Sequence, residues 1–266
     1  MNPTNDNAPA PEPVRFSRLK LLGKSPAHYA CPTGESAALR KGSALHAYLL
    51  GQRHKVAIYD DGKRDPRSKA YQQFLAAHPD QTILIPSELA PVEGMRAAIE
   101  MHGRAMELLT GGVAEQTIHW DLGGRGCQGT PDVVHVRPDG SKVLVELKTC
   151  RSSAPELFKW QARGLAYHAQ VAWYADGLER SMAYAPGPVT ATYIVAVESS
   201  PPHPVTVLRV CDSMLERGRR QWRLWFEMLR VCEQSGRFPG YVEADVDWED
   251  EDGEADLAWG DDEEAA

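Results

Sequence analysis

The sequence of 266 residues predicts an α/β protein in which a mixed central β-sheet is flanked by helices. Two observations favour this class. Runs rich in β-branched residues, which are typical of strands, alternate with longer segments whose apolar residues recur at helical spacing. In the second half of the chain these segments follow the order strand, hairpin, helix, strand, strand and helix. A chain of this length can also bury a substantial core.

Proline- and glycine-rich segments divide the first half of the chain. Residues 1–15 are polar and rich in proline, so we expect a flexible leader there and a folded domain over residues 16–242. Ser43 is the expected N-cap of a first helix, and Pro91 suits the first turn of a later one. The expected elements are helices at 43–50, 68–77 and 91–109, a strand at 115–121, and a glycine-rich connection at 123–126.

A β-hairpin is predicted in the middle of the chain, with strands at 133–136 and 142–148. Pro138 presets φ for the first turn position, and Gly140 can adopt the left-handed conformation of a type I turn closed by a G1 bulge. Such a loop pairs residues whose numbers sum to 278. Asp132 therefore falls opposite Glu146.

After the hairpin we expect a long helix from about residue 152 to 180, strands at 190–198 and 204–210, and a final helix at 212–234 capped by Asp212. The buried residues of the two helices are expected to be apolar, namely Trp160, Val171, Leu178, Trp222, Trp225, Phe226 and Leu229. Arginines crowd one region of the last helix, more than pairing with its own acids explains.

The hairpin brings two acids and a lysine together. Residues directly opposed across two strands have Cβ atoms about 4.5–5.5 Å apart, so two carboxylates there repel unless a cation lies between them. Glu146 and Lys148 share one face of their strand, whereas Leu147 points to the other. A hard divalent ion next to an ammonium group suits phosphodiester hydrolysis.

The plainer interpretation is that Asp132 caps a turn while Glu146 and Lys148 form a solvated face. A short D-x(n)-E-x-K pattern usually reflects such a solvated surface rather than a catalytic site. Here the strand that carries Glu146 is otherwise apolar, and the predicted register opposes the two acids. Both observations favour a site.

Charge is distributed unevenly along the chain. The formal net charge is −8, but residues 243–266 hold thirteen acids and no Lys or Arg, which leaves 37 − 13 = 24 acids against 29 bases in residues 1–242. The body is therefore about +5, as expected of a polyanion-binding protein. We expect the acidic tail to be disordered, with a role in solubility, in docking a partner, or in competing weakly with DNA for the basic body.

The remaining composition excludes several protein classes. The five cysteines are scattered without a C-x-x-C pair, so neither a disulfide framework nor a zinc site is predicted. No apolar run is long enough to span a membrane, and the N-terminal residues lack the apolar segment of a signal peptide. We expect a cytoplasmic protein.

Two further polar residues lie on predicted helices. A lone histidine such as His46 is usually a hydrogen-bonded core residue rather than a ligand. Gln170 lies one turn from Tyr174 on a helix expected to pack on the sheet. A buried amide needs partners, which a phosphate or a base edge could supply.

With these residues, the chain resembles the PD-(D/E)XK nuclease superfamily, and within it the exodeoxyribonuclease VIII (RecE-like) family of phage recombination exonucleases. The resemblance covers residues 16 to about 242 and rests on the order and spacing of several short motifs. These are S-P-A-H-Y at 25–29, G-S-A-L-H at 42–46, G-T-P-D at 129–132, E-L-K-T at 146–149, Y-H-A-Q at 167–170 with Tyr174, V-A-V-E at 195–198 with the prolines 201–202, and G-R-F-P-G-Y at 236–241.

The resemblance implies a role for each hairpin residue. Asp132 and Glu146 are implied metal ligands, assisted by the carbonyl of Leu147, and Lys148 is the implied catalytic lysine. Thr130 departs from the family pattern, because relatives often have arginine there. Glu146 also stands where many relatives have aspartate.

Four residues outside the hairpin acquire expected roles in the same way. His46 matches the histidine at the metal, and Gln170 with Tyr174 matches a Q-x-x-x-Y helix motif that contacts the DNA strand. Glu115 is a candidate for an additional acid behind the metal ligands.

The family implies a Mg²⁺-dependent exonuclease, with Mn²⁺ as a substitute, that digests double-stranded DNA from a 5′ end and leaves a 3′ tail for a single-strand annealing protein. It also implies a ring-shaped homo-oligomer and no membrane. Two alternatives stay open: a noncatalytic DNA-end-binding module that recruits an annealing protein, and an endonuclease of the same superfamily.

Overall fold

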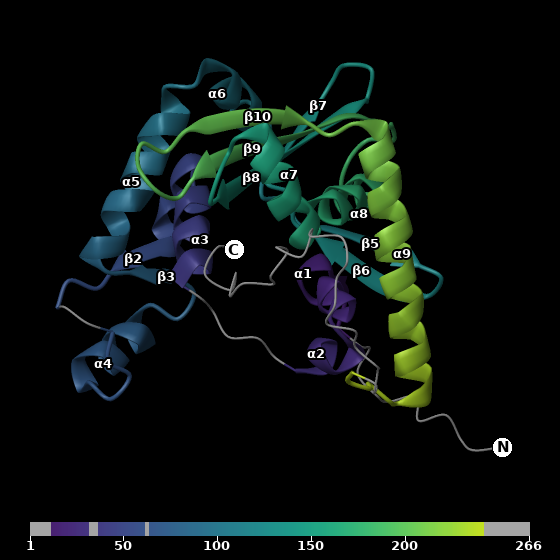
Figure 1. Ribbon diagram of the computed structural model, residues 1–266, viewed down its shortest axis with the longest axis horizontal. Helices are drawn as coiled ribbons and strands as arrows, with labels where there is room; N and C mark the ends of the chain where they lie inside the picture. Colours follow the sequence, from purple (N-terminus) through teal and green to yellow (C-terminus); the bar gives the residue numbers. More distant parts are fainter. Residues whose placement is uncertain (1–11, 32–36, 62–63, 242–266) are drawn as a thin grey trace, which may run out of the picture.

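A five-stranded mixed sheet forms the centre of the protein (Figure 1). The structure is a computed structural model, and it describes residues 12–31, 37–61 and 64–241. The strand order is β10-β9-β8-β7-β4, with β8 and β9 parallel and the other neighbours antiparallel. The strands are β4 (Val113–Ala114), β7 (Val133–Val136), β8 (Lys142–Cys150), β9 (Val189–Glu198) and β10 (Val205–Arg209). The predicted α/β class is confirmed.

Strand β8 is buried on both faces because a separate apolar core lies on each side of the sheet. Leu144 contributes to the core under α8 (Tyr167–Arg180) and α9 (Asp212–Ser235). Val145 and Leu147 contribute to the opposite core. The helices of that second core are α3 (Ala37–Leu49), α5 (Pro86–Glu100) and α6 (Gly103–Leu109). A polar residue on β8 therefore lies in a largely water-free environment.

Smaller elements complete the fold. Strands β1 (Val14–Arg15), β6 (Arg125–Gly129) and β5 (Ile118–Leu122) form one sheet, and β2 (Val56–Ile58) pairs with β3 (Thr82–Leu84). The remaining helices are α1 (Phe16–Leu19), η1 (Lys20–Gly23), α2 (Pro26–Ala30), η2 (Arg53–Lys55), α4 (Lys69–Ala77) and α7 (Pro155–Gly164). Among the described residues, no helix has both the length and the apolar character needed to cross a bilayer.

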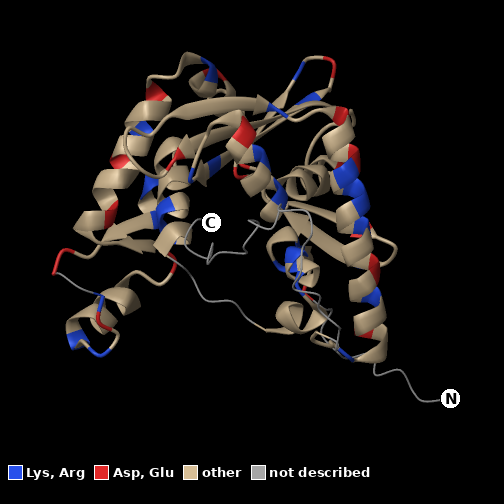
Figure 2. Ribbon diagram, viewed as in Figure 1, with Lys and Arg blue, Asp and Glu red and all other residues tan. Residues whose placement is uncertain are grey.

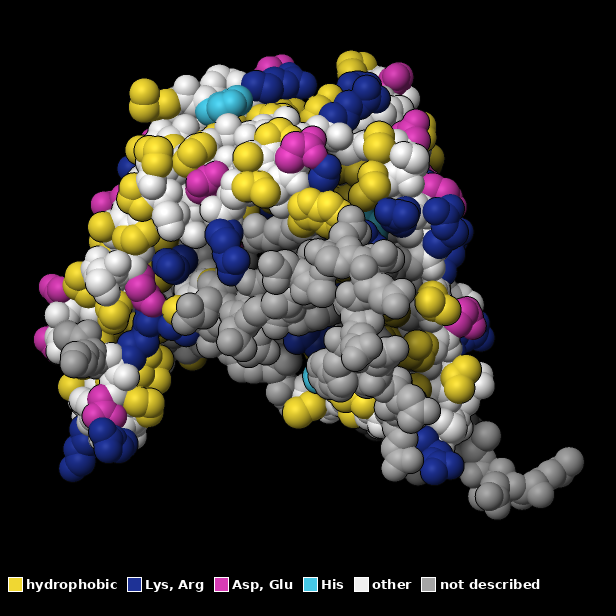
Figure 3. All heavy atoms as spheres, in the orientation of Figure 1, with side chains coloured by type: hydrophobic (Ala, Val, Ile, Leu, Met, Phe, Trp, Pro, Cys, Tyr) yellow, Lys and Arg dark blue, Asp and Glu magenta, His cyan; other side chains and the backbone are white. Residues whose placement is uncertain are grey.

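The molecule has the shape of an arch. Helices α3, α5 and α4 form one side, and α9 with α1 and α2 forms the other (Figure 1). Lys and Arg residues occur on both sides of this arch, on α3 and in the α1 region (Figure 2). The space-filling view shows basic side chains on both sides of the concave underside (Figure 3).

The central hairpin has the predicted register. Val133 pairs with Val145 and Val136 with Lys142, so each pair sums to 278. The turn is closed by a hydrogen bond from the Gly140 amide to the Arg137 carbonyl, and Gly140 has a φ of 81°. Local turn chemistry was sufficient to specify this element.

Several predicted boundaries in the first half are wrong. The first helix begins by residue 37 rather than at Ser43, so Ser43 lies inside α3 instead of capping it. Helix α5 begins at Pro86, where the Glu88 side chain accepts from the Ile85 amide, and Pro91 lies within the helix. The predicted helix over 91–109 is in fact two, since α5 ends at Glu100 and α6 starts at Gly103.

Part of the expected leader forms a strand. Val14 is buried and pairs with Cys127 of β6. The expected acidic tail over 243–266 lies outside the described residues, as does most of the expected leader. The predicted connection at 123–126 is only partly a loop. Gly123 and Gly124, both with positive φ, form a tight turn, and residues 125–129 form β6.

The long helix predicted over 152–180 is broken into α7 and α8 at Ala166, whose φ of 57° is left-handed. Of α7 only Phe158 is buried in the core, and Trp160 is 48% exposed rather than buried. Val171 and Leu178 on α8 are buried as predicted. The apolar residues expected on α9 are also buried, but Asp212 is not its N-cap, which is Cys211.

The arginines of α9 have a partner on the neighbouring helix. Asp176 of α8 lies 2.8 Å from Arg219 Nε and 3.7 Å from Arg223. Arg219 and Arg220 also pair with Glu216 of their own helix. A large part of the arginine cluster therefore joins α8 to α9.

Substitution of Gly218 by alanine should destabilise the protein by separating α8 from α9. A methyl group at this position would lie 2.1 Å from the His168 carbonyl oxygen, which is backbone and cannot rotate away. Overpacking of this kind costs about 1–3 kcal/mol, which is a decrease of several degrees in Tm for a domain of this size. Gly103→Ala, with no atom within 4 Å of the added methyl, is the matched control and should melt like the wild type.

Candidate active site

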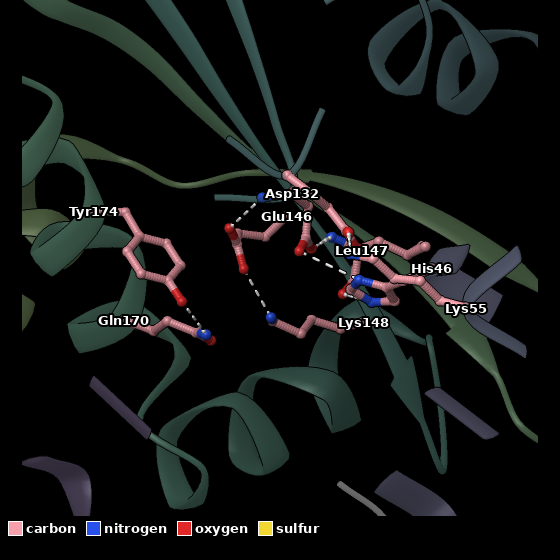
Figure 4. A network of polar contacts seen from close by, with 9 residues as sticks. His46, Lys55, Asp132, Glu146, Leu147, Lys148, Gln170 and Tyr174 are labelled. Atoms are coloured by element: carbon pink, nitrogen blue, oxygen red, sulfur yellow. Dashed lines mark hydrogen bonds and ion pairs between the residues drawn. The ribbon is translucent and has the colours of Figure 1, made fainter. Parts of the chain in front are cut away.

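The two predicted acids meet at the start of β7 and the middle of β8. Asp132 immediately precedes β7, and its backbone amide donates to Glu146 Oε1 over 3.2 Å. The Leu147 amide donates in turn to Asp132 Oδ2 over 2.7 Å. The Asp132 and Glu146 side chains thus point to the same region (Figure 4). The predicted juxtaposition of the acids is confirmed.

Lys148 completes the cluster from the same face of β8. Its Nζ donates to Glu146 Oε2 over 2.8 Å and lies 5.3 Å from the centre of the Tyr167 ring. The lysine side chain is 12% exposed and that of Glu146 1% exposed. The plainer interpretation, in which Glu146 and Lys148 form a solvated face, is therefore wrong.

His46 reaches the cluster from α3, although 101 residues separate it from Leu147. Its Nδ1 lies 3.2 Å from Asp132 Oδ1, and its Nε2 lies 3.0 Å from the Leu147 carbonyl oxygen. Both partners only accept hydrogen bonds, so both ring nitrogens are satisfied only when the imidazole carries two protons. Burial lowers the pKa of His46, but the charge of Asp132 and its hydrogen bond to the imidazole outweigh burial, so the pKa is raised.

The two acids have different electrostatic environments. Burial, followed by the charge of Asp132, raises the pKa of Glu146 to about 7. Burial also opposes ionisation of Asp132, but His46 and Lys148 outweigh it and lower the pKa of Asp132. The pKa of Lys148 is raised because Glu146 and Asp132 outweigh its burial. The raised pKa of Glu146 shows that the two buried carboxylates still repel each other, and a bound cation would reduce this repulsion.

Gln170 and Tyr174 face the acids from α8 (Figure 4). The Gln170 Nε2 donates to the Tyr174 hydroxyl over 3.3 Å. Burial, and then the charge of Glu146, raises the pKa of Tyr174, so its hydroxyl stays protonated and can donate. The two residues are placed where they could contact a DNA strand, which stays a prediction.

Glu115 lies close behind Asp132. Its backbone amide donates to the Asp132 carbonyl over 2.9 Å, while its carboxylate accepts from Lys55 over 3.3 Å. Glu115 adopts a left-handed φ of 47°. The residue therefore positions the Asp132 backbone, and its carboxylate is turned to Lys55.

The donor atoms suit Mg²⁺ in kind. Carboxylate and carbonyl oxygens are its preferred ligands. Within the described chain, no three His, Cys, Asp or Glu side chains converge on one point. A metal ion would therefore be held by the Leu147 carbonyl together with the side chains of Asp132, Glu146 and His46.

Sequence reasoning missed one charged neighbour of the site. Burial, and then the charge of Lys148, lowers the pKa of Lys20 of η1. Lys20 stands in a short segment between two leucines, and no motif or spacing connects it with the hairpin. The effect of Lys148 on the pKa of Lys20 depends on the fold.

Substitution of Gly129 by alanine should impair the site without touching a polar group. The added methyl would lie 2.8 Å from the Tyr174 ring, so the tyrosine must move. Displacing a positioning residue by about 1 Å can cost up to about 100-fold in rate, and we expect at least a 10-fold loss of DNA hydrolysis. Gly126→Ala, on the same strand with no atom within 4 Å of its methyl, should retain wild-type activity. Equal activity of both variants would contradict a role for Tyr174.

Comparison with known proteins identifies the fold. Residues 16–246 match the model of a family described as a PDDEXK-like domain of unknown function, DUF3799. The chain is also similar to a crystal structure from Eubacterium rectale named "putative exonuclease", with 14% identity and a TM-score of 0.62 over 93% of this chain and 97% of that one. The crystal structure of SSO0001 aligns with 11% identity and a TM-score of 0.29 over 79% of this chain and 85% of that one. No curated protein matches the sequence.

Proposed function

The chain belongs to the PDDEXK-like family DUF3799, and from that premise we propose that it is a metal-dependent deoxyribonuclease. The observation that carries the proposal is the contact network of Asp132, Glu146 and Lys148, with His46 and the Leu147 carbonyl beside it. Two buried acids and a buried lysine are costly to assemble, and a reaction is the best reason to retain them.

Mg²⁺, or Mn²⁺ in its place, would be held by Asp132, Glu146, the Leu147 carbonyl and His46. When bound, it would supply a Lewis acid for the phosphoryl oxygen and a more acidic water. In the hydrolysis the water oxygen bonds to phosphorus while a bond from phosphorus to a sugar oxygen breaks. The water loses a proton, and the departing sugar oxygen takes one up. Lys148 would orient the water or offset the negative charge that develops on the phosphoryl oxygens.

The finer proposal is a 5′→3′ double-stranded DNA exonuclease of the exodeoxyribonuclease VIII type. Support comes from the ordered motifs in residues 16–242 and from the name of the Eubacterium rectale protein. Such an enzyme would leave 3′ single-stranded tails for an annealing protein, and it would act as a ring-shaped homo-oligomer on DNA ends. Recombination, a phage origin and cytoplasmic action belong to the same proposal.

Digestion of linear and circular DNA tests this function. We expect a linear duplex with Mg²⁺ to lose a 5′ label as mononucleotides, whereas a 3′ label stays on a shortening single strand. Phosphorothioate linkages at the 5′ ends should block the reaction, and the same linkages at the 3′ ends should not. Equal cleavage of closed circular plasmid would instead favour an endonuclease of the superfamily.

A noncatalytic end-binding protein is the alternative from a different class. The acidic residues 243–266 favour it, because a polyanionic segment could recruit an annealing partner. It predicts that Asp132→Ala leaves biological function intact and that deletion of residues 243–266 abolishes it. The nuclease proposal predicts the reverse.

A further inference from the structure

The Lys148 ammonium has two contacts of different kinds. Its Nζ donates to Glu146 Oε2 over 2.8 Å and lies 5.3 Å from the centre of the Tyr167 ring. The first contact is an ion pair, whose strength depends on the charge of Glu146. The second is a cation–π contact with an uncharged ring, because burial raises the pKa of Tyr167 and keeps its hydroxyl protonated.

The Tyr167 ring is held firmly by the core. Tyr167 is 7% exposed and belongs to the apolar core under α8 and α9. It is the first residue of α8, directly after the left-handed Ala166, and its ring centre lies 6.1 Å from that of Phe158, the buried residue of α7. The four-carbon stem of Lys148 is flexible by comparison, so its ammonium needs a fixed neighbour to define its position.

Helical spacing places Tyr167 with the two residues of α8 that face the acids. Positions 167, 170 and 174 follow the i, i+3, i+7 spacing of one helix face. Gln170 and Tyr174 on this face point to the acids (Figure 4), and Tyr167 contacts the lysine. Helix α8 thus presents three residues to the site, of which only Gln170 and Tyr174 belong to the Q-x-x-x-Y motif.

A bound cation would weaken one contact of Lys148 and leave the other unchanged. Glu146 is a metal ligand in the proposed function, and a divalent cation on its carboxylate would offset much of the negative charge that attracts Lys148. The Tyr167 ring has no net charge to be offset, and Mg²⁺ prefers oxygen ligands to an aromatic face. The ring contact therefore gains importance when a metal is bound.

We propose that Tyr167 is a positioning residue for the nuclease reaction, because its ring holds the Lys148 ammonium in place when a metal ion offsets the charge of Glu146. The inference rests on the proposed function and deepens it. The Tyr167 hydroxyl is not required, since the ring face alone attracts the ammonium. In the competing interpretation Tyr167 only fills the core.

Two substitutions of Tyr167 separate the ring from the hydroxyl. Tyr167→Phe keeps the ring, and its kcat should stay within about 2-fold of the wild type. Tyr167→Leu keeps an apolar side chain but removes the ring. We expect it to lower kcat about 10-fold and to change KM by less than about 2-fold, because a displaced lysine affects the chemical step rather than substrate binding.

Phe226→Leu is the matched control for the loss of a buried ring. Phe226 is 4% exposed in the same core as Tyr167 but lies on α9. Its substitution should lower Tm and leave kcat within about 2-fold of the wild type. If Tyr167→Leu likewise lowers Tm without lowering kcat, Tyr167 only fills the core and the proposal is wrong.

A double-mutant cycle with Lys148 distinguishes positioning from packing. In a Lys148→Met background there is no ammonium to hold, so Tyr167→Leu should cause no further loss in single-turnover rate. A further loss of about 10-fold in that background would show that Tyr167 acts independently of Lys148, contrary to the proposal.

NMR tests the contact without hydrolysis. The ring current of Tyr167 should shift the Lys148 protons next to Nζ upfield in the wild type and in Tyr167→Phe, but not in Tyr167→Leu, and loss of the signal in Lys148→Met assigns it. The upfield shift should persist when Mg²⁺ is added, and its disappearance would overturn the proposal. Wild-type protein that keeps the shift with Mg²⁺ but never degrades DNA would contradict the nuclease function while supporting Tyr167 as the residue that holds Lys148.

Discussion

Lys148→Ala should lower DNA hydrolysis by about 100- to 1,000-fold, the usual effect of removing one preorganised charge that stabilises a transition state. Lys148 donates to Glu146 over 2.8 Å and is nearly inaccessible to solvent, so no other side chain can readily replace it. Duplex binding and Mg²⁺ binding should be retained, because the implied ligands are untouched. Single-turnover kinetics on an end-labelled duplex measures the chemical step, and calorimetry measures the metal.

Lys159→Ala is a suitable control for this experiment. Lys159 lies exposed on α7, where it contacts Glu156 and the ring of Trp160 of the same helix. We expect its hydrolysis rate to equal that of the wild type. Loss of Mg²⁺ binding in Lys148→Ala, or a rate within a few-fold of the wild type, would be inconsistent with the catalytic role assigned to Lys148.

Stabilisation by Mg²⁺ should increase strongly between pH 6 and pH 8. Without metal, the folded state binds a proton on His46 and on Glu146 more tightly than the unfolded state, since the pKa of each group is raised. Protonated His46 and protonated Glu146 therefore stabilise the folded state at low pH. This stabilisation is lost as the pH rises through the pKa of each group in the folded state, and the pKa of Glu146 is about 7. The lowered pKa of Asp132 adds stability that is already complete at pH 6.

A metal ion competes with these protons for the same atoms. Thermal melts with Mg²⁺ and with EDTA should therefore differ by a small amount at pH 6 and by several degrees at pH 8. Asp132→Asn should abolish the difference at both pH values, and Gly126→Ala should preserve it. A wild-type Mg²⁺ effect that is independent of pH would contradict the protonation states assigned to His46 and Glu146.

The hairpin could be predicted from the sequence because its structure is determined locally. Pro138 and Gly140 specify the turn, the turn specifies the register, and the register places Asp132 against Glu146. The β-branched strands and the apolar face of α9 were predictable for the same reason. In each case residues close in sequence carry the information.

The helix boundaries were less predictable because tertiary packing overrides local preference. Nothing in the local sequence distinguishes Ala166 as a left-handed break, yet the break places α8 against the sheet and leaves Trp160 in solvent. Pro91 favours the first turn of a helix, where its missing amide costs nothing, yet it lies in the interior of α5. These features depend on which elements meet in the folded chain.

The candidate site was predictable in part. The residues alone indicated Asp132, Glu146 and Lys148, and His46 became a candidate only through the family resemblance. Its contact with Leu147 joins residues 101 positions apart, and no periodic pattern in the sequence can predict such a contact. Lys20 has neither a motif nor a pattern, so the effect of Lys148 on the pKa of Lys20 depends on the fold.

Anomalous diffraction from crystals grown with Mn²⁺ tests the central claim most directly. We expect one strong peak in direct contact with carboxylate oxygens of both Asp132 and Glu146 and with the Leu147 carbonyl oxygen, with the Lys148 ammonium adjacent. A peak bound elsewhere, while His46 still bridges Asp132 and Leu147 and Lys148 still pairs with Glu146, would show that the acids do not share a metal.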